Sequence, residues 1–201
     1  APRIKVTAVV DPNLDNAASM SERTGAAAYS SLSQALSEGS FDAVDLMLPH
    51  DLHEEAAIEA FGAGKHVLLE KPMAPDLASC ERILEAAELA NTVFMIAEQA
   101  QYWPDIKHAR DLIDAGQIGE VVTARACFYD PLSVNATKDG GVPWRFSLAR
   151  AGGGICIDGG AHWIRPLRML LGEVSEVIAA MGNHIPNMEG ESWVRALMLF
   201  D

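Results

Sequence analysis

The sequence lacks the patterns that mark membrane-spanning, secreted and disulfide-bonded proteins. No apolar run reaches the roughly 18 residues that a membrane-spanning helix needs. The first residues lack the basic-then-apolar profile of a secretion signal. The three cysteines, Cys80, Cys127 and Cys156, are odd in number, widely spaced and contain no CxxC pair. This argues against a disulfide framework and a zinc knuckle, so we expect reduced thiols in a cytoplasmic protein.

Clusters of basic residues are also missing. The 201 residues include 15 Lys or Arg and 28 Asp or Glu, which gives a formal net charge of −13. Without a Lys/Arg cluster to neutralise phosphates, nucleic acids and anionic membranes are poor partners. With 49% hydrophobic and 21% charged residues, the chain instead has the composition of a globular protein with a substantial core.

Short apolar runs alternate with helical patterns over the first half of the chain. Strands are predicted at 6–10, 43–48, 66–69 and 93–96, and helices at 15–23, 33–37, 54–61 and from 77 onward. Strands and helices that alternate with short connections form βαβ crossovers, which place parallel strands in a sheet covered on both faces. We therefore expect an α/β domain over residues 1–100.

The pattern changes after about Gln99. A helix is predicted at 104–115, a strand at 121–129, a loop rich in Gly, Asp and Asn at 133–143, a helix at 162–171, and strands at 174–181 and 193–200. Long strands with few helices predict an α+β domain over residues 101–201, with a mixed or antiparallel open sheet packed on helices. Because the chain stops inside a predicted strand, we expect this domain to be incomplete.

Asp11 is the first candidate for a functional residue. It follows the first predicted strand, where a carboxylate can accept hydrogen bonds from the adenosine ribose of a dinucleotide. The alternative is a turn that ends the strand, since Asp-Pro pairs are common in turns. The glycine-rich turn G-x-G-x-x-G that should precede it is absent. Either that segment lies outside this chain, or the protein binds no dinucleotide.

Glu70, Lys71 and Pro72 follow another predicted strand, at the edge of a parallel sheet where ligands bind. The Lys71 ammonium could hold a substrate hydroxyl and a nicotinamide together. The alternative is a surface lysine before a proline turn. Pro72 fixes its own φ angle and can adopt a cis peptide bond, which would aim Lys71 rigidly.

The third candidate is the segment from Gly152 to His162. Asp158 and His162 are four residues apart, so on a helix they share one face. A carboxylate beside an imidazole can orient it as a general base, and the glycines at 152–154 allow close approach of backbone or ligand. The alternative is a helix start with Asp158 near the cap and His162 packed in the interior.

Two other sets of residues have plainer interpretations. His50 and His53 have the spacing of a metal-binding pair, but no third ligand is evident, and residues at the start of a helix are the more typical explanation. No metal site is therefore expected. The four tryptophans, Trp103, Trp144, Trp163 and Trp193, are expected in the core and in subunit contacts.

Taken together, several segments of the chain resemble the glucose–fructose oxidoreductase / inositol dehydrogenase (Gfo/Idh/MocA) family. These segments are Pro49–His53, AGKHVLLEKP at 63–72, IGEV at 118–121, Trp144-Arg145, 152–162 and LGEV at 171–174. The first of the two longest ends in Lys71 and the second contains Asp158 and His162. The resemblance spans nearly the whole chain.

The resemblance implies a Rossmann-like dinucleotide-binding domain, followed by an α/β domain whose open sheet builds homo-oligomers. It implies hydride transfer between a nicotinamide cofactor, NAD or NADP, and a hydroxyl-bearing carbon of a sugar, polyol or related cyclic alcohol. By position, Lys71 would hold the reacting hydroxyl and the cofactor, His162 would remove the hydroxyl proton, and Asp158 would orient substrate or base. Asp11 favours NAD, because a carboxylate repels the 2′-phosphate of NADP.

The resemblance also assigns the remaining site residues. Cofactor contacts are expected from Asp11, Pro49, His50, His53, Glu70, Lys71 and Pro72, and substrate contacts from Lys71, Gln101, Trp144, Arg145, Asp158 and His162. Four features depart from the family: the glycine-rich first strand is missing, His50 stands where an asparagine is usual, 99–103 differs from the usual Asn-x-Arg pattern, and Arg165-Pro166 replaces an acidic residue. These departures leave open a non-catalytic relative that binds a sugar-like ligand or serves as a structural subunit, and they suggest a chain that lacks both ends.

Overall fold

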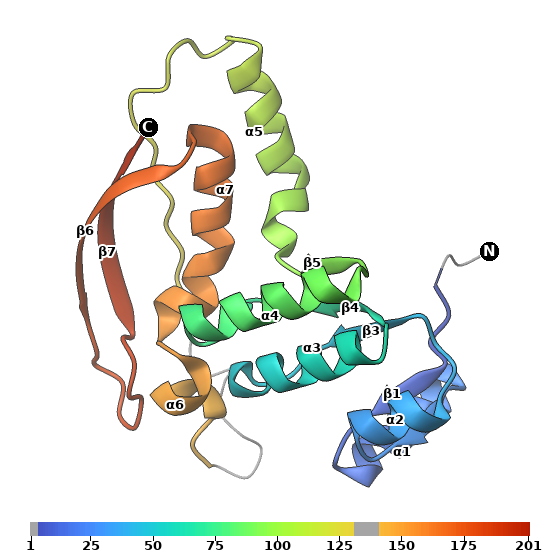
Figure 1. Ribbon diagram of the computed structural model, residues 1–201. Coiled ribbons are helices and arrows are strands. Elements are labelled where there is room, and N and C mark those ends of the chain that lie inside the picture. Colours follow the sequence, from blue (N-terminus) through green and yellow to red (C-terminus); the bar gives the residue numbers. More distant parts are fainter. Residues whose placement is uncertain (1–3, 131–140) are drawn as a thin grey trace. The chain divides into compact units, whose positions relative to one another are not determined.

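The computed structural model describes residues 4–130 and 141–201, so most of the loop predicted at 133–143 lies outside the described residues. The chain divides into two compact units, and Figure 1 labels their helices and strands. The first contains the residues up to Met47, Leu52–Leu69 and Ala78–Met95. The second contains Leu48–Asp51, Glu70–Leu77 and Ile96–Asp201.

In the first unit, short strands alternate with helices. The strands are β1 (Ala8–Val10), β2 (Ala27–Tyr29), β3 (Ala43–Leu46), β4 (His66–Leu69) and β5 (Phe94–Ile96), and the helices are α1 (Leu14–Thr24), α2 (Leu32–Glu38), α3 (His53–Gly62) and α4 (Leu77–Ala90). β1 pairs with β2 in parallel, and β3 pairs with β4 in parallel within the order β3-β4-β5. The predicted parallel-sheet fold of this half is confirmed.

The helix ends follow from local chemistry that the sequence carries. The Asn13 side chain accepts the backbone N–H of Asp15 at the start of α1, and Ser31 does the same for Gln34 in α2. Gly25 ends α1 in the left-handed region with φ 72°, which glycine adopts without steric cost. β2 is not among the predicted strands, because three residues with the sequence Ala-Ala-Tyr carry no periodic signal.

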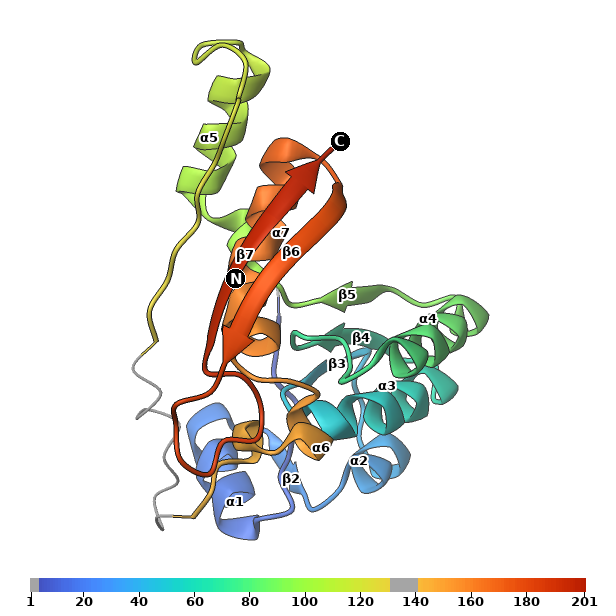
Figure 2. The same cartoon turned by 90° about the vertical axis from the view of Figure 1, so that its left-hand side faces the viewer.

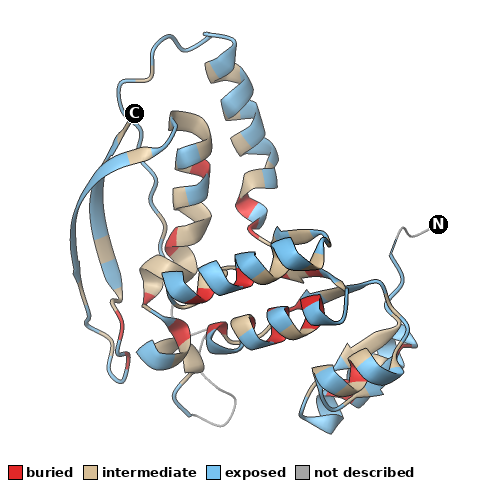
Figure 3. Ribbon diagram, in the orientation of Figure 1, coloured by how far each residue is buried: buried red, intermediate tan, exposed pale blue. Residues whose placement is uncertain are grey.

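The core of the first unit lies between its strands and α3 and α4, where buried residues are marked in red in Figure 3. Val67 and Leu69 of β4 are buried, as are Phe61 of α3 and Ile83 of α4. Burying one such side chain contributes about 1.5–3 kcal/mol. The rings of Phe61 and Phe94 meet edge to face with centroids 5.3 Å apart. This core holds β4 in place, and β4 leads directly into Glu70 and Lys71.

The described residues of the second unit form three α-helices and one antiparallel hairpin, besides short 3-10 and π-helical turns. The helices are α5 (Pro104–Asp114), α6 (Leu148–Ala151) and α7 (Ala161–Leu171), and the hairpin consists of β6 (Val174–Gly182) and β7 (Trp193–Phe200). Figure 2 shows the hairpin running alongside α7. A π-helical turn, Cys156–Gly160, leads directly into α7. The predicted antiparallel sheet and the helix at 162–171 are confirmed.

The strand predicted at 121–129 is wrong, because the structure describes no strand in that stretch. A strand needs a neighbour whose backbone groups complete its hydrogen bonds. Among the described residues of this unit, β6 and β7 pair only with each other. The apolar pattern that suggested a strand is left largely exposed, with Val122 90% accessible. In residues 4–130 and 141–201 no helix combines the length and apolar character needed to cross a membrane.

Candidate active site

Lys71 is a mostly buried, ion-paired lysine rather than a surface residue before a turn. Its Nζ donates hydrogen bonds to Oδ1 of Asp158 at 2.7 Å and to the backbone carbonyl of the same residue at 2.8 Å. The Lys71 side chain is only 14% exposed. The peptide bond between Lys71 and Pro72 is cis, the isomer that the sequence allowed for. Two residues 87 positions apart in the chain are thereby joined within the second unit.

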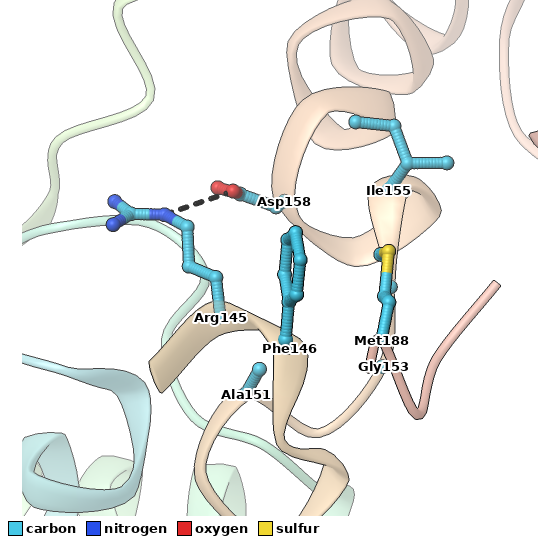
Figure 4. A pocket seen from close by; sticks show the side chains of 8 residues that line it. Arg145, Phe146, Ala151, Gly153, Ile155, Asp158 and Met188 are labelled. Carbon is cyan, nitrogen blue, oxygen red and sulfur yellow. Dashed lines mark hydrogen bonds and ion pairs between the residues drawn. The ribbon is translucent and has the colours of Figure 1, made fainter. Parts of the chain in front are cut away.

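Asp158 bridges two cationic side chains. While Lys71 occupies Oδ1, the Nε of Arg145 donates to Oδ2 at 3.0 Å, as the dashed line in Figure 4 shows. Burial raises the pKa of the Asp158 carboxyl, but the hydrogen bond and charge of Lys71, followed by the charges of Arg145 and His50, lower it by more. The pKa of Asp158 therefore lies below its ordinary value, and the group is a carboxylate at neutral pH.

The π-helical turn that carries Asp158 is anchored by Glu191. The two carboxylate oxygens of Glu191 accept the backbone N–H groups of Gly154 at 3.0 Å and Cys156 at 2.9 Å, and its carbonyl accepts that of Ile155 at 2.8 Å. These bonds satisfy N–H groups that a helix start leaves without partners. A Cβ at Gly154 would lie 2.0 Å from the Glu191 carbonyl oxygen, so only glycine fits there.

A second close approach fixes the loop that carries Lys71. Gly152 has φ 82°, and a Cβ on it would lie 2.5 Å from the carbonyl oxygen and 2.6 Å from the Cα of Pro75. The loop Glu70–Leu77 therefore packs directly on the glycine run. The prediction that these glycines allow close approach is confirmed for backbone against backbone. The two contacts position the lysine loop and the aspartate turn within one unit.

His162 lies one helical turn after Asp158, in the first turn of α7, and its partner is Glu98. The Nδ1 of His162 is 2.8 Å from Oε1 of Glu98. The same oxygen accepts the backbone N–H of Ala100 at 2.8 Å. Glu98 is 8% exposed, and its Oε2 is buried without a hydrogen-bond partner in the described part of the chain.

Sequence reasoning missed Glu98 and expected Asp158 to orient the imidazole. In the structure the Asp158 carboxylate instead accepts hydrogen bonds from Lys71 and Arg145. A signal for Glu98 was present, because this residue follows β5 at the carboxyl end of a strand, the same rule that singled out Lys71.

The rings of Trp144 and His50 pack beside Arg145, the second partner of Asp158. The Arg145 guanidinium lies over the Trp144 ring at 4.4 Å, and the His50 ring meets Trp144 edge-on at 4.7 Å. His50 is buried, and its Nδ1 donates to the carbonyl of Ala151 at 2.9 Å. Phe146, Ile155 and Met188 line the same small pocket as Arg145 and Asp158 in Figure 4.

Gln101 contacts a residue outside the ion pairs of Lys71, Asp158 and Arg145. Its Oε1 accepts a hydrogen bond from Arg165 Nη2 at 3.2 Å on an exposed surface. Both residues are among those that depart from the family pattern. Gln101 is therefore tied to α7, the helix that also carries His162. Its contact with substrate stays a prediction.

Asp11 and His53 belong to the first unit. The Asp11 carboxylate accepts the backbone N–H of Asn13 at 2.7 Å and the side-chain amide of Asn16 at 3.2 Å. The strand-ending turn is therefore present, while the contact with ribose stays a prediction. His53 is fully buried as the first residue of α3. Within residues 4–130 and 141–201, no group of three or more His, Cys, Asp or Glu side chains is arranged to hold a metal ion.

The remaining cofactor candidates lie beside Lys71 or at the end of β3. Glu70 accepts the backbone N–H of Lys71 through its own Oε2 at 3.1 Å. Pro49 follows β3 and directly precedes His50. Pro49, Glu70 and Pro72 all lie beyond the carboxyl ends of parallel strands, where ligands of open α/β sheets bind. Their contacts with a cofactor stay predictions.

Two family models match the chain. Residues 1–98 match the oxidoreductase family with an NAD-binding Rossmann fold, and residues 106–201 match the GFO/IDH/MocA C-terminal domain. These matches correspond to the parallel and antiparallel parts described above. They leave only a short connection and the first helical residues of the second half outside.

Individual relatives agree with the family models. The chain is 34% identical to levoglucosan dehydrogenase of Pseudarthrobacter phenanthrenivorans over 143 residues, which cover 71% of this chain and 36% of that protein. It is 31% identical to dTDP-3,4-didehydro-2,6-dideoxy-alpha-D-glucose 3-reductase of Actinomadura kijaniata over 183 residues, 91% of this chain and 53% of that one. The chain spans about half the length of the curated relatives it matches.

A solved structure of a dehydrogenase also has the fold of this chain. The WlbA dehydrogenase from Bordetella pertussis, in complex with NADH and UDP-GlcNAcA, superposes with a TM-score of 0.84 at 26% identity. The match covers 98% of this chain and 56% of that one. The fold, the family models and the relatives agree, and the chain belongs to the Gfo/Idh/MocA family of NAD-binding oxidoreductases.

Proposed function

We propose that this chain carries the reaction centre of an NAD(P)-dependent dehydrogenase that acts on a hydroxyl-bearing carbon of a sugar, polyol or related cyclic alcohol. One observation carries the proposal. The Lys71 ammonium is held by Asp158, and Asp158 lies one helical turn before His162. All three residues belong to the second unit. The names of the relatives, levoglucosan dehydrogenase and a deoxysugar reductase, support a sugar-like substrate.

Lys71 is suited to bind the reacting oxygen. An ammonium has three N–H donors, and the two bonds to Asp158 occupy two of them. The third donates to the substrate hydroxyl. Because the aspartate holds the ammonium in one place, the lysine loses little further freedom when substrate binds. Its positive charge also stabilises the alkoxide character that develops on this oxygen as the proton leaves.

His162 acts as the general base. Its Nδ1 faces Glu98, so Nε2 is the nitrogen that can receive a proton from the hydroxyl. A bound nicotinamide would supply the hydride acceptor for this step. As the C–H bond breaks with its electron pair, the O–H proton passes to Nε2 and the carbon becomes a carbonyl. In the reverse direction His162 returns the proton to the reduced substrate.

The residues present fit a dinucleotide. Asp11 follows β1 of the parallel pair β1–β2, the position from which a carboxylate contacts adenosine ribose hydroxyls. Its negative charge favours NAD over NADP. The other candidates for cofactor contacts are Pro49, His50, His53, Glu70 and Pro72, of which Glu70 and Pro72 would shape the cofactor pocket beside Lys71. Substrate contacts beyond the reacting carbon would come from Trp144, Arg145 and Gln101.

The test is substitution of Lys71 in the full-length protein. Lys71→Ala should abolish turnover with NAD while leaving the circular dichroism spectrum and calorimetric NAD binding close to wild type. Lys107→Ala is the matched control, because that lysine is exposed and lies over the Tyr102 ring at 5.4 Å. Near-normal turnover of Lys71→Ala with every sugar and polyol oxidised by the wild type would remove Lys71 from the mechanism.

The same proposal includes a homo-oligomer formed through the β6–β7 hairpin. Ile178 of β6 pairs with Leu197 of β7, and Leu199 lies two residues further along on the same face; all three are exposed. Contiguous exposed apolar side chains mark interaction surfaces. Light scattering of the full-length protein should give a multiple of the monomer mass, and Ile178→Asp should lower that mass; a monomeric wild type would contradict this part.

A further inference from the structure

Glu98 stands out as a buried acidic residue whose one ionisable partner in the described part of the chain is His162. Its side chain is 11% exposed, compared with 23% for the His162 side chain it contacts. Oε1 accepts a hydrogen bond from the Ala100 N–H at 2.8 Å and lies 2.8 Å from Nδ1 of His162. Oε2 is buried and has no hydrogen-bond partner among the described residues. A buried charge that is left without compensation is costly, so its position calls for an explanation.

The geometry fixes which nitrogen of His162 carries hydrogen. A carboxylate oxygen can only accept, so Nδ1 must be the donor in this contact. The neutral imidazole then has its lone pair on Nε2, the nitrogen remote from Glu98. The Ala100 N–H anchors Oε1 independently of the histidine. Glu98 thus holds both the tautomer and the direction of the imidazole ring.

The alternative positioning group, Asp158, is already engaged. Its two oxygens bind Lys71 and Arg145, so its negative charge is matched by two positive ones. Among residues 4–130 and 141–201, in contrast, the one ion pair of Glu98 is with His162. Proton uptake at Nε2 would turn this single buried negative charge into an ion pair of zero net charge. Asp158 therefore pairs with Lys71 and Arg145 before the reaction, whereas Glu98 pairs with the imidazolium of His162 after the proton has been transferred.

We propose that Glu98 is the positioning residue of the general base. It holds His162 as the Nδ1–H tautomer before the reaction and stabilises the imidazolium that forms when Nε2 takes the hydroxyl proton. Glu98 supplies the negative charge that faces this imidazolium, as the carboxylate of a carboxylate–histidine pair does. This inference rests on the proposed role of His162, and it assigns to Glu98 the orienting task that the sequence had assigned to Asp158.

Two substitutions separate charge from orientation. Glu98→Gln keeps an oxygen at the Oε1 position, so it retains the tautomer but removes the negative charge. Glu98→Ala removes both. We expect kcat to fall about 10–100-fold for Glu98→Gln and about 10³-fold for Glu98→Ala, within the range that general-base groups contribute. KM and calorimetric NAD binding should change less than about threefold, since neither oxygen of Glu98 is proposed to touch substrate. Glu120→Gln, an exposed glutamate of the same unit, is the control.

A spectroscopic readout makes the test independent of activity. Long-range 1H–15N spectra of protein labelled at histidine, recorded without cofactor, should show His162 as the Nδ1–H tautomer in the wild type and in Glu98→Gln. The signal is assigned by its loss in His162→Asn. In Glu98→Ala the Nε2–H tautomer should appear. If Glu98→Ala unfolds, the Glu98→Gln kinetics together with the wild-type spectrum decide the question.

The outcomes separate this inference from the proposed function. Full turnover in His162→Asn and Lys71→Ala would overturn the proposed function itself. Loss of turnover in those two variants, with wild-type kcat in Glu98→Gln or an Nε2–H tautomer in the wild type, would overturn only the role of Glu98. A fall in kcat with KM unchanged and the Nδ1–H tautomer observed would support both.

Discussion

Replacing Gly152 by alanine should loosen the loop that carries Lys71. Two costs add at this position. An L-residue with φ 82° loses about 1–2 kcal/mol relative to glycine. The new Cβ would also lie 2.5 Å from the Pro75 carbonyl oxygen and 2.6 Å from the Pro75 Cα, and backbone atoms cannot move aside as a side-chain end can. Overpacking of this kind costs about 1–3 kcal/mol.

Gly116 provides a control that carries only the first cost. It has φ 67°, close to that of Gly152, and it also follows a helix, but a Cβ there meets nothing within 4 Å. The conformational entropy that alanine removes from the unfolded chain is the same at both positions. The difference between the two variants therefore isolates the collision with Pro75, at about 1–3 kcal/mol in the free energy of unfolding.

Urea unfolding measures this difference. With a slope of about 2 kcal/mol per molar urea, the midpoint of Gly152→Ala should lie about 0.5–1.5 M below that of Gly116→Ala. Turnover should also fall in Gly152→Ala, because the displaced loop moves the Lys71 ammonium away from Asp158. Equal midpoints for the two variants would refute the reasoning, since they would mean that the Pro75 backbone does not confine this glycine.

Two further predictions concern ionisable groups outside the proposed centre. The pKa of Glu54 is lowered to about 2, chiefly by its hydrogen bond with Arg82. The Glu54–Arg82 pair should therefore stabilise the fold fully above pH 4.5 and lose this effect as the pH falls from 4.5 toward 2. The loss in the free energy of unfolding should be at most about 1 kcal/mol, because the pair is exposed. Glu54→Gln should abolish this loss in acid unfolding curves. Iodoacetamide should modify Cys127 before Cys156, because a hydrogen bond with Tyr129 lowers the pKa of Cys127 whereas burial raises that of Cys156. Equal labelling rates of the two cysteines in timed peptide mass spectrometry would contradict this order of modification.

Local chemistry explains why most elements were predictable. Helices α1 and α5 end where Gly25 and Gly116 adopt positive φ, and the apolar runs that became β4 and β7 begin and end at the predicted residues. The stretch 121–129 failed for the opposite reason. Alternation of apolar residues reports which side chains suit a sheet, but it carries no information on whether a neighbouring strand is present to complete the hydrogen bonds.

The candidate site also combines residues that local sequence patterns identified with contacts that they could not predict. The rule that ligands gather at the carboxyl ends of parallel strands identified Lys71, and spacing on a helix identified Asp158 and His162. Pairings across the chain were not accessible, because Lys71 meets Asp158 across 87 positions and His162 meets Glu98 across 64. Helical spacing suggested that Asp158 would face the imidazole. Only the folded chain brings a nearer carboxylate to it.

The π-helical turn at Cys156–Gly160 makes this segment intolerant of changes in length. A turn closed by i→i+5 bonds contains one residue more than an α-helical turn. Deleting Gly159 would allow the turn to close as ordinary α-helix, and Asp158 would rotate by about 100° about the axis of α7 relative to His162. Neither side chain would have been altered, yet the carboxylate would face away from its lysine. Here the number of residues between two groups determines their orientation as firmly as the groups themselves determine the chemistry.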